Sequence, residues 1–137
     1  MLVVTLDFGE AVLLDNGKIE VRLLKRVGER MKVGINAPEE MDIEREAVWV
    51  RSKIKKLLSN DLSDPKVQQA ISDFLRVYRV DEDLFNRARS GDKTAQFDLG
   101  KYLFKYHYFG FAQLFLEMAA KQGVKEANRF LDKIIKH

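Results

Sequence analysis

The sequence predicts an α+β protein with an N-terminal antiparallel β domain and an α-helical C-terminal half. Apolar and polar residues alternate with period two over residues 1–45, and the period becomes helical from Glu44 onward. A polar break at residues 59–64 then separates the first helix from the helices that follow. We therefore expect a β domain with its following helix over 1–58 and a helical extension over 59–137.

Five strands are expected, near residues 1–6, 10–15, 18–26, 30–36 and 41–45. The alternation is clearest from Lys18 to Leu23, where every second residue is apolar, as in a half-buried antiparallel strand. Asn16-Gly17 favours a tight hairpin turn, because both residues tolerate positive φ. Pro38 ends the fourth strand, since proline cannot donate to a ladder.

Six helices are expected, near residues 44–58, 65–78, 81–90, 92–105, 108–121 and 124–136. Asp64 can cap the second helix, with Pro65 at its first position. The acidic residues 81–83 favour a helix start, because carboxylates are stabilised at the positive end of the helix dipole.

A weak internal repeat lies in the helical half. Gly91-Asp-Lys-Thr-Ala95 recurs as Gly123-Val-Lys-Glu-Ala127, at a spacing of 32 residues. Spacings in the low thirties are typical of helix-pair repeats. Residues 91–131 resemble Sel-one-like repeats, which are of the tetratricopeptide kind. The alternative is a helical bundle whose spacing is coincidental.

Composition excludes several functional classes. The 137 residues include no cysteine, which excludes a disulfide scaffold, a thiolate zinc site and a cysteine nucleophile. The two histidines, His107 and His137, have no clear carboxylate or metal partner in the sequence. We therefore expect no enzyme, no catalytic residue, no metal and no cofactor. No apolar run is long enough to span a bilayer and no signal peptide is evident, so we expect a cytoplasmic protein without a membrane partner.

The segment Gly34-Ile-Asn-Ala-Pro-Glu-Glu-Met-Asp-Ile-Glu-Arg-Glu46 joins the fourth strand to the fifth through an Asn-Ala-Pro turn. Read with Met1-Leu-Val-Val-Thr-Leu-Asp-Phe-Gly-Glu10, it resembles the CsrA/RsmA family of carbon storage regulators, over about residues 1–50. The resemblance implies a bacterial RNA-binding regulator of translation, in which two chains interlock as a homodimer. A β domain of this size also buries little surface and has two unpaired edges, which independently favours dimerisation.

The resemblance also implies a binding site for hairpin messenger RNA with an unpaired GGA in its loop. That site lies where the first strand of one subunit meets the last strand of the other. The implied RNA-binding residues are Val4, Thr5, Ile43, Arg45 and Glu46, with Arg45 central. An arginine suits this task, because its planar guanidinium can pair with phosphate or a guanine edge and can stack on a base.

The first strand departs from the family pattern. Leu6 and Asp7 stand where the family has two arginines, which predicts weaker RNA binding with a smaller salt dependence. Arg45 itself has a second interpretation, a surface ion pair with Asp42, Glu44 or Glu46. The net charge of +3 means that any RNA contact comes from a local patch.

Several aromatic residues have two interpretations. Phe8 and Trp49 can stack on bases, or Trp49 can pack on the apolar face of its helix. A second group can form the core between helices or a protein-binding groove, and comprises Tyr102, Phe104, Tyr106, Tyr108, Phe109, Phe111 and Phe115.

Three functions follow from these patterns. The first is a post-transcriptional regulator that binds messenger RNA as a homodimer. The second is a dimerisation scaffold without tight RNA binding, whose helical domain recruits a protein partner. The third is a poor RNA binder that forms mixed dimers with an ordinary family member.

Overall fold

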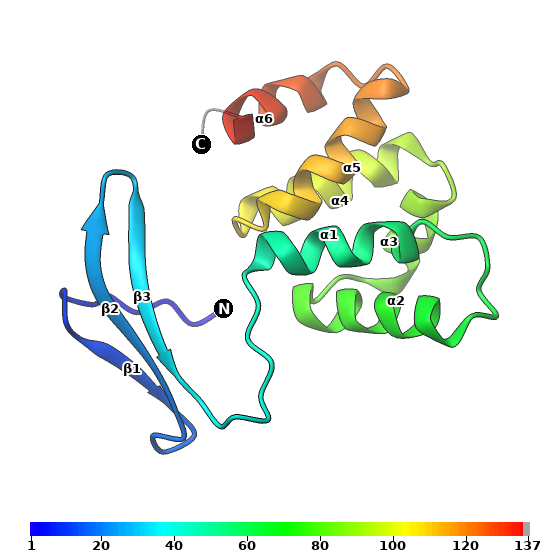
Figure 1. Cartoon of the computed structure of the whole chain (residues 1–137). Coiled ribbons are helices and arrows are strands. Elements are labelled where there is room, and N and C mark those ends of the chain that lie inside the picture. The colour runs from blue at the N-terminus through cyan, green and yellow to red at the C-terminus, as the bar shows by residue number, and fades with distance from the viewer. Residues whose placement is uncertain (136–137) are drawn as a thin grey trace. The chain divides into compact units, whose positions relative to one another are not determined.

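The structure is a computed structural model, and it describes residues 1–135. The chain divides into two compact units, a β unit over Met1–Ile43 and a helical unit that begins at Glu44 (Figure 1). The division falls after Ile43 rather than after residue 58, because helix α1 (Glu46–Leu57) buries Val50 and Leu57 in the core of the helical unit.

The β unit is a three-stranded antiparallel sheet of β1 (Ala11–Leu14), β2 (Ile19–Val27) and β3 (Arg30–Asn36), in the order β1-β2-β3. The predicted hairpin turn is confirmed. Asn16 and Gly17 have φ values of 56° and 87°, the combination that matches the right-handed twist of the flanking strands.

One face of this sheet is apolar. The ladder aligns Val12 with Val21 and Val21 with Ile35, and residues that lie opposite one another share a face. The same alternation gives this face eight apolar side chains: Val12, Leu14, Ile19, Val21, Leu23, Met31, Val33 and Ile35. None of residues 1–43, all of which the structure describes, is buried. The apolar face is therefore formed but not covered.

The expected strands over 1–6 and 41–45 are not formed, so the five-stranded sheet is not confirmed. Both segments lie within the described residues and have no ladder partner. The ladder with β2 extends only as far as Gly9, whose N–H donates to the Leu23 carbonyl at 2.6 Å. The reason is physical: an extended segment becomes a strand only where a neighbour supplies partners for its N–H and C=O groups. A single chain supplies none for these two segments.

The helical unit follows the predicted helices closely. Its helices are α1, α2 (Pro65–Tyr78), α3 (Glu82–Arg89), α4 (Lys93–Lys105), α5 (Phe109–Lys121) and α6 (Glu126–Ile135). The predicted starts of α2 and α3 are confirmed. The Asp64 carboxylate accepts from the Lys66 N–H at 2.8 Å, and that of Asp81 accepts from the Leu84 N–H at 2.9 Å.

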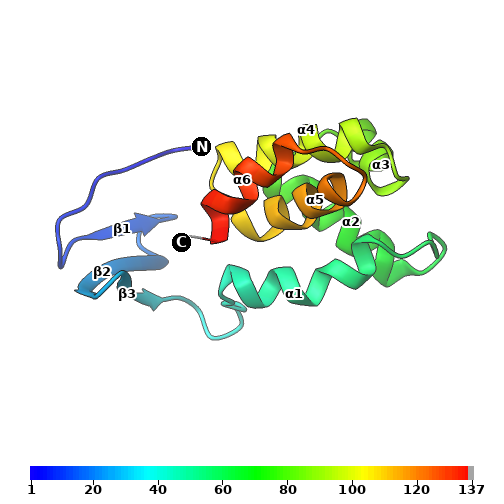
Figure 2. The ribbon, with the colours of Figure 1, turned by 90° about the horizontal axis from the view of Figure 1, so that it is seen from above.

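Consecutive helices pack as neighbours around one core. Helix α4 packs against both α3 and α5, α6 packs against α5, and α1 packs against α2 and α5 (Figure 2). At the centre, the Phe74 ring lies 5.1 Å from the Phe85 ring and 4.8 Å from the Phe111 ring. Buried aromatic rings contribute large apolar areas, so this unit carries its own core.

Positions 32 residues apart occupy equivalent places in the helix pairs. Ala95 and Ala127 are both buried at the start of α4 and α6. Gly91 and Gly123 both have positive φ, of 105° and 92°, just before those helices. The resemblance to Sel-one-like repeats itself stays a prediction.

Gly100 permits the closest contact between α4 and α5. A Cβ at this position would lie 2.6 Å from the Leu116 Cγ and 3.2 Å from the Leu116 backbone nitrogen. We expect Gly100→Ala to lower the free energy of unfolding by about 1–3 kcal/mol, because the helices must move apart. Urea denaturation followed by circular dichroism measures this. Lys101→Ala, at the exposed neighbouring position, is the control, and equal stability of the two variants would contradict the prediction.

Candidate nucleic-acid interface

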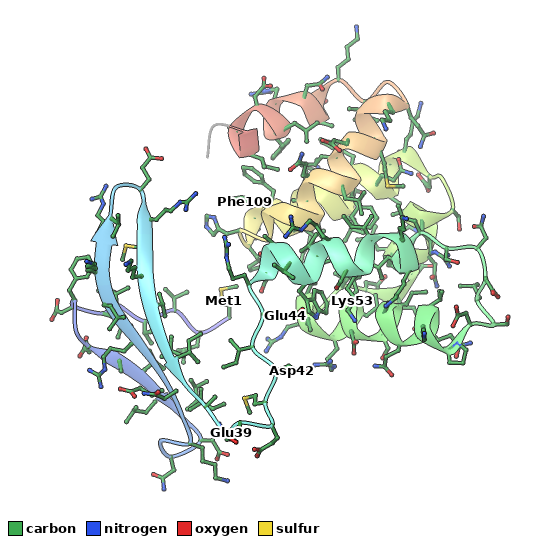
Figure 3. The ribbon with its side chains drawn as sticks, in the orientation of Figure 1. Met1, Glu39, Asp42, Glu44, Lys53 and Phe109 are labelled. Carbon is green, nitrogen blue, oxygen red and sulfur yellow. The ribbon has the colours of Figure 1, made fainter. Side chains whose placement is uncertain are left out.

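Arg45 begins the helical unit rather than ending a strand. Its backbone is extended, with φ −66° and ψ 141°, and its carbonyl accepts from the N–H groups of Val48 at 3.0 Å and Trp49 at 3.1 Å. Arg45 is thus the N-cap residue of α1, immediately after Glu44, which Figure 3 marks at the entry to that helix. Within the described residues, its exposed guanidinium forms no ion pair with Glu44 or Glu46. The side chain therefore remains available to a ligand.

Glu46 is tied to the core of the helical unit. The Tyr78 hydroxyl donates to the Glu46 Oε2 at 3.1 Å. Burial, and then the charge of Glu46, raise the pKa of Tyr78 well above its ordinary value, so this hydroxyl keeps its proton. The bond fixes the first turn of α1 on α2, and with it the position of Arg45.

Tyr78→Phe tests this anchor. We expect the free energy of unfolding to fall by about 1 kcal/mol, because the hydrogen bond is lost while the ring contacts remain and Glu46 stays in water. Thermal unfolding of the two proteins measures the difference. Tyr106→Phe serves as the control, because that hydroxyl makes no hydrogen bond to a described residue, and equal losses in both variants would contradict the anchor.

The other predicted site residues lie in the β unit. Val4, Thr5 and Ile43 are exposed and belong to segments without ladder partners. The structure therefore places these three residues in one unit and Arg45 with Glu46 in the other. Their open backbone groups are ready to pair with another strand or with a ligand.

Trp49 packs against other aromatic rings of the helical unit. Its half-buried ring lies 6.0 Å from the Tyr78 ring and 6.1 Å from the Phe111 ring. The Lys53 ammonium, labelled in Figure 3, lies 5.3 Å from its centroid. Phe8, by contrast, is exposed in the turn before β1.

The aromatic group of the helical half divides between core and surface. Phe111 and Phe115 are buried in the core. Tyr102 and Tyr108 are half-buried and Tyr106 is exposed, so their rings are partly open to solvent. The core interpretation is thus confirmed for these two phenylalanines. Phe104, Tyr102 and Tyr108 also pack against the core while staying partly open to solvent, and Tyr106 is exposed.

A separate groove of about 340 Å³ lies between α1 and α5. Its lining is mostly apolar, with charged groups at the rim, and comprises Ala47, Val50, Arg51, Ile54, Gly110, Gln113, Leu114 and Glu117. Such a lining suits an apolar side chain better than a phosphate.

Over residues 1–135, no helix is long and apolar enough to cross a membrane. Across the same described residues, no group of three or more histidine and carboxylate side chains could hold a metal ion.

A protein-family model matches the N-terminal part of the chain. No solved structure matches the chain. Residues 1–54 match the model of the CsrA family, described as the global regulator protein family. The match covers the whole β unit and Arg45, and it ends inside α1. The N-terminal 54 residues of this chain are therefore similar to the CsrA global regulators.

Proposed function

We propose that this protein is a post-transcriptional regulator that binds messenger RNA as a homodimer and modulates translation. The observation that carries the proposal is the match of residues 1–54 to the CsrA global regulators. The RNA ligand is a hairpin with an unpaired GGA in its loop, in keeping with the rule that proteins read RNA sequence in single-stranded loops. The proposal includes action in the bacterial cytoplasm, where such transcripts are translated.

The uncovered sheet supports a second copy as partner. A face of eight apolar side chains with no buried residue gains most when it packs on an equivalent face. In the proposed dimer, residues 1–6 of one copy pair with residues 41–45 of the other. That pairing satisfies both segments that lack ladder partners in the single chain.

The proposed RNA site lies along this junction. Arg45 contributes the main charged contact, because its guanidinium is exposed and unpaired among the described residues. Backbone groups and side chains of Val4, Thr5, Ile43 and Glu46 line the remainder. Leu6 and Asp7 supply no positive charge, so binding depends less on salt than in a site with two further arginines.

The experiment is binding of the purified protein to a GGA hairpin RNA at two salt concentrations, beside a hairpin whose loop lacks GGA. Loop-dependent, salt-sensitive binding is the expected result. Equal affinity for the two hairpins would overturn RNA recognition, and a monomeric mass by light scattering at micromolar concentration would overturn the dimer.

A second candidate function has specific support. The β unit would serve only for dimerisation, and the groove between α1 and α5 would hold a protein partner. Leu6 and Asp7 favour this alternative, as does the apolar lining of the groove. It predicts capture of a defined protein that Ile54→Lys abolishes, together with no GGA-dependent RNA binding.

A further inference from the structure

Four helices of the helical unit end in the same backbone arrangement. At the ends of α2, α3, α4 and α5, one residue adopts positive φ and the next N–H donates back to a carbonyl five positions earlier. This is the Schellman arrangement, in which the left-handed residue is usually glycine. The left-handed residues are Arg79 (φ 53°), Gly91 (φ 105°), His107 (φ 65°) and Gly123 (φ 92°).

Arg79 and His107 therefore occupy positions where glycine would be less strained. Left-handed backbone is disfavoured for residues with a Cβ, and strained residues gather at functional sites. Both side chains are exposed, and neither makes a hydrogen bond or ion pair to any other residue described. The His107 ring does lie 5.4 Å from the Phe109 ring, edge to face.

Each strained residue lies next to at least one of three tyrosines. The Tyr102 hydroxyl lies 2.8 Å from the Tyr78 carbonyl and 2.9 Å from that of Arg79. His107 lies in the chain between Tyr106 and Tyr108. We call this set the tyrosine surface: Arg79, Tyr102, Lys105, Tyr106, His107 and Tyr108.

The rings of the tyrosine surface form a continuous row. The Tyr106 ring lies 5.2 Å from the Tyr102 ring and 6.4 Å from the Tyr108 ring. The Lys105 ammonium lies 5.6 Å from the Tyr106 centroid. Among the residues that the structure describes, Lys105 has no carboxylate partner. Partly exposed rings beside cations without a carboxylate partner are a combination that binds unpaired nucleotides, through stacking and phosphate contact.

The tyrosine surface is linked to the proposed RNA contact within one unit. The Tyr108 ring lies 4.7 Å from the Tyr78 ring, and Tyr78 holds Glu46, the neighbour of Arg45. Arg45 and the tyrosine surface therefore belong to the same packed unit and are connected through Tyr78.

We infer that the tyrosine surface binds unpaired RNA nucleotides that flank the loop held at Arg45. The inference rests on the proposed function and adds a second contact region, on the helical unit. Nucleotides fit better than an apolar peptide, because the exposed groups are aromatic rings and cations, whereas the apolar lining belongs to the groove between α1 and α5.

The test compares a GGA hairpin with the same hairpin carrying unpaired tails on both sides of its stem, using the full chain. We expect the tails to raise the affinity of the protein for the hairpin. Tyr106→Ala should lower the affinity for the tailed hairpin about five- to tenfold, and should leave the affinity for the hairpin without tails unchanged. Arg79→Gly should also lower the slope of log affinity against log salt by about 0.7 for the tailed RNA. The melting temperature of the Arg79→Gly protein should be unchanged or higher, because glycine adopts the left-handed backbone at residue 79 without strain. A merely structural role for Arg79 would instead lower the melting temperature.

Lys125→Ala is the matched control, because it removes one exposed charge elsewhere in the same unit. If the hairpin without tails is not bound, the proposed function fails and this inference fails with it. If that hairpin is bound but tails add nothing, only the inference is overturned. The same holds if Arg79→Gly and Lys125→Ala have equal effects on the tailed RNA.

Discussion

Arg45→Ala is expected to weaken binding of the GGA hairpin about ten- to a hundredfold while the protein remains a dimer. A paired guanidinium contact to a base edge contributes about 1–3 kcal/mol, and every 1.4 kcal/mol is a factor of ten in affinity. The fold should tolerate the change, because Arg45 caps α1 through its backbone carbonyl and makes no side-chain cap. Fluorescence anisotropy with labelled RNA measures the affinity, and light scattering measures the mass.

Arg51→Ala is the control for this experiment. Arg51 is also exposed, lies on the same helix and carries the same charge, but it borders the groove with α5. Its loss should lower affinity only through the general charge of the protein. Equal losses for the two variants would mean that Arg45 has no specific contact with the RNA.

Ile35→Lys is expected to break the homodimer. Two lysines, one from each copy, would enter the apolar interface without partners, and an unpaired buried charge costs about 3 kcal/mol or more. Affinity between the copies should therefore fall by at least about a hundredfold. RNA binding should be lost with it, because the proposed site needs strands from both copies. The helical unit should still unfold cooperatively, since its core contains no residue of the β unit.

Asn36→Lys is the matched control at the next position. Asn36 lies on the opposite face of β3, where its amide donates to the Glu20 carboxylate at 2.7 Å. A lysine there gains a carboxylate neighbour and leaves the apolar face intact. Dissociation of both variants, or of neither, on size-exclusion chromatography with light scattering would contradict the assignment of the dimer interface.

The helices and the central hairpin could be predicted from the sequence because their signals are local. Asp64-Pro65 marks a helix start by its own chemistry, and Asn16-Gly17 marks a turn by its own φ preferences. The two outer strands could not be predicted in this way. Residues 1–6 and 41–45 carry a strand pattern, but a strand needs a neighbour, and no local pattern shows which chain supplies it.

The surroundings of the candidate site residues could not be predicted from the sequence for the same kind of reason. Arg45 could be singled out through the family resemblance, but its attachment to the helical unit follows from the contact of Glu46 with Tyr78, 32 residues away. Arg79 was missed, because an arginine after a helix carries no signal of strain by itself. The available signal was the contrast with Gly91 and Gly123, which follow their helices in the same arrangement.

Helix α1 has a consequence for any attempt to exchange parts of this protein with a relative. The family match stops at residue 54, but Leu57 of the same helix is fully buried in the helical core. A chimera joined at the end of the match, or a fragment cut there, would split α1 and separate Val50 from Leu57, which are both buried in the same core. A junction between residues 43 and 44 keeps every buried helical residue with its neighbours. Such a graft would carry Arg45 with the helices, so the donor of the helical unit, and not the donor of the sheet, would supply the proposed RNA contact.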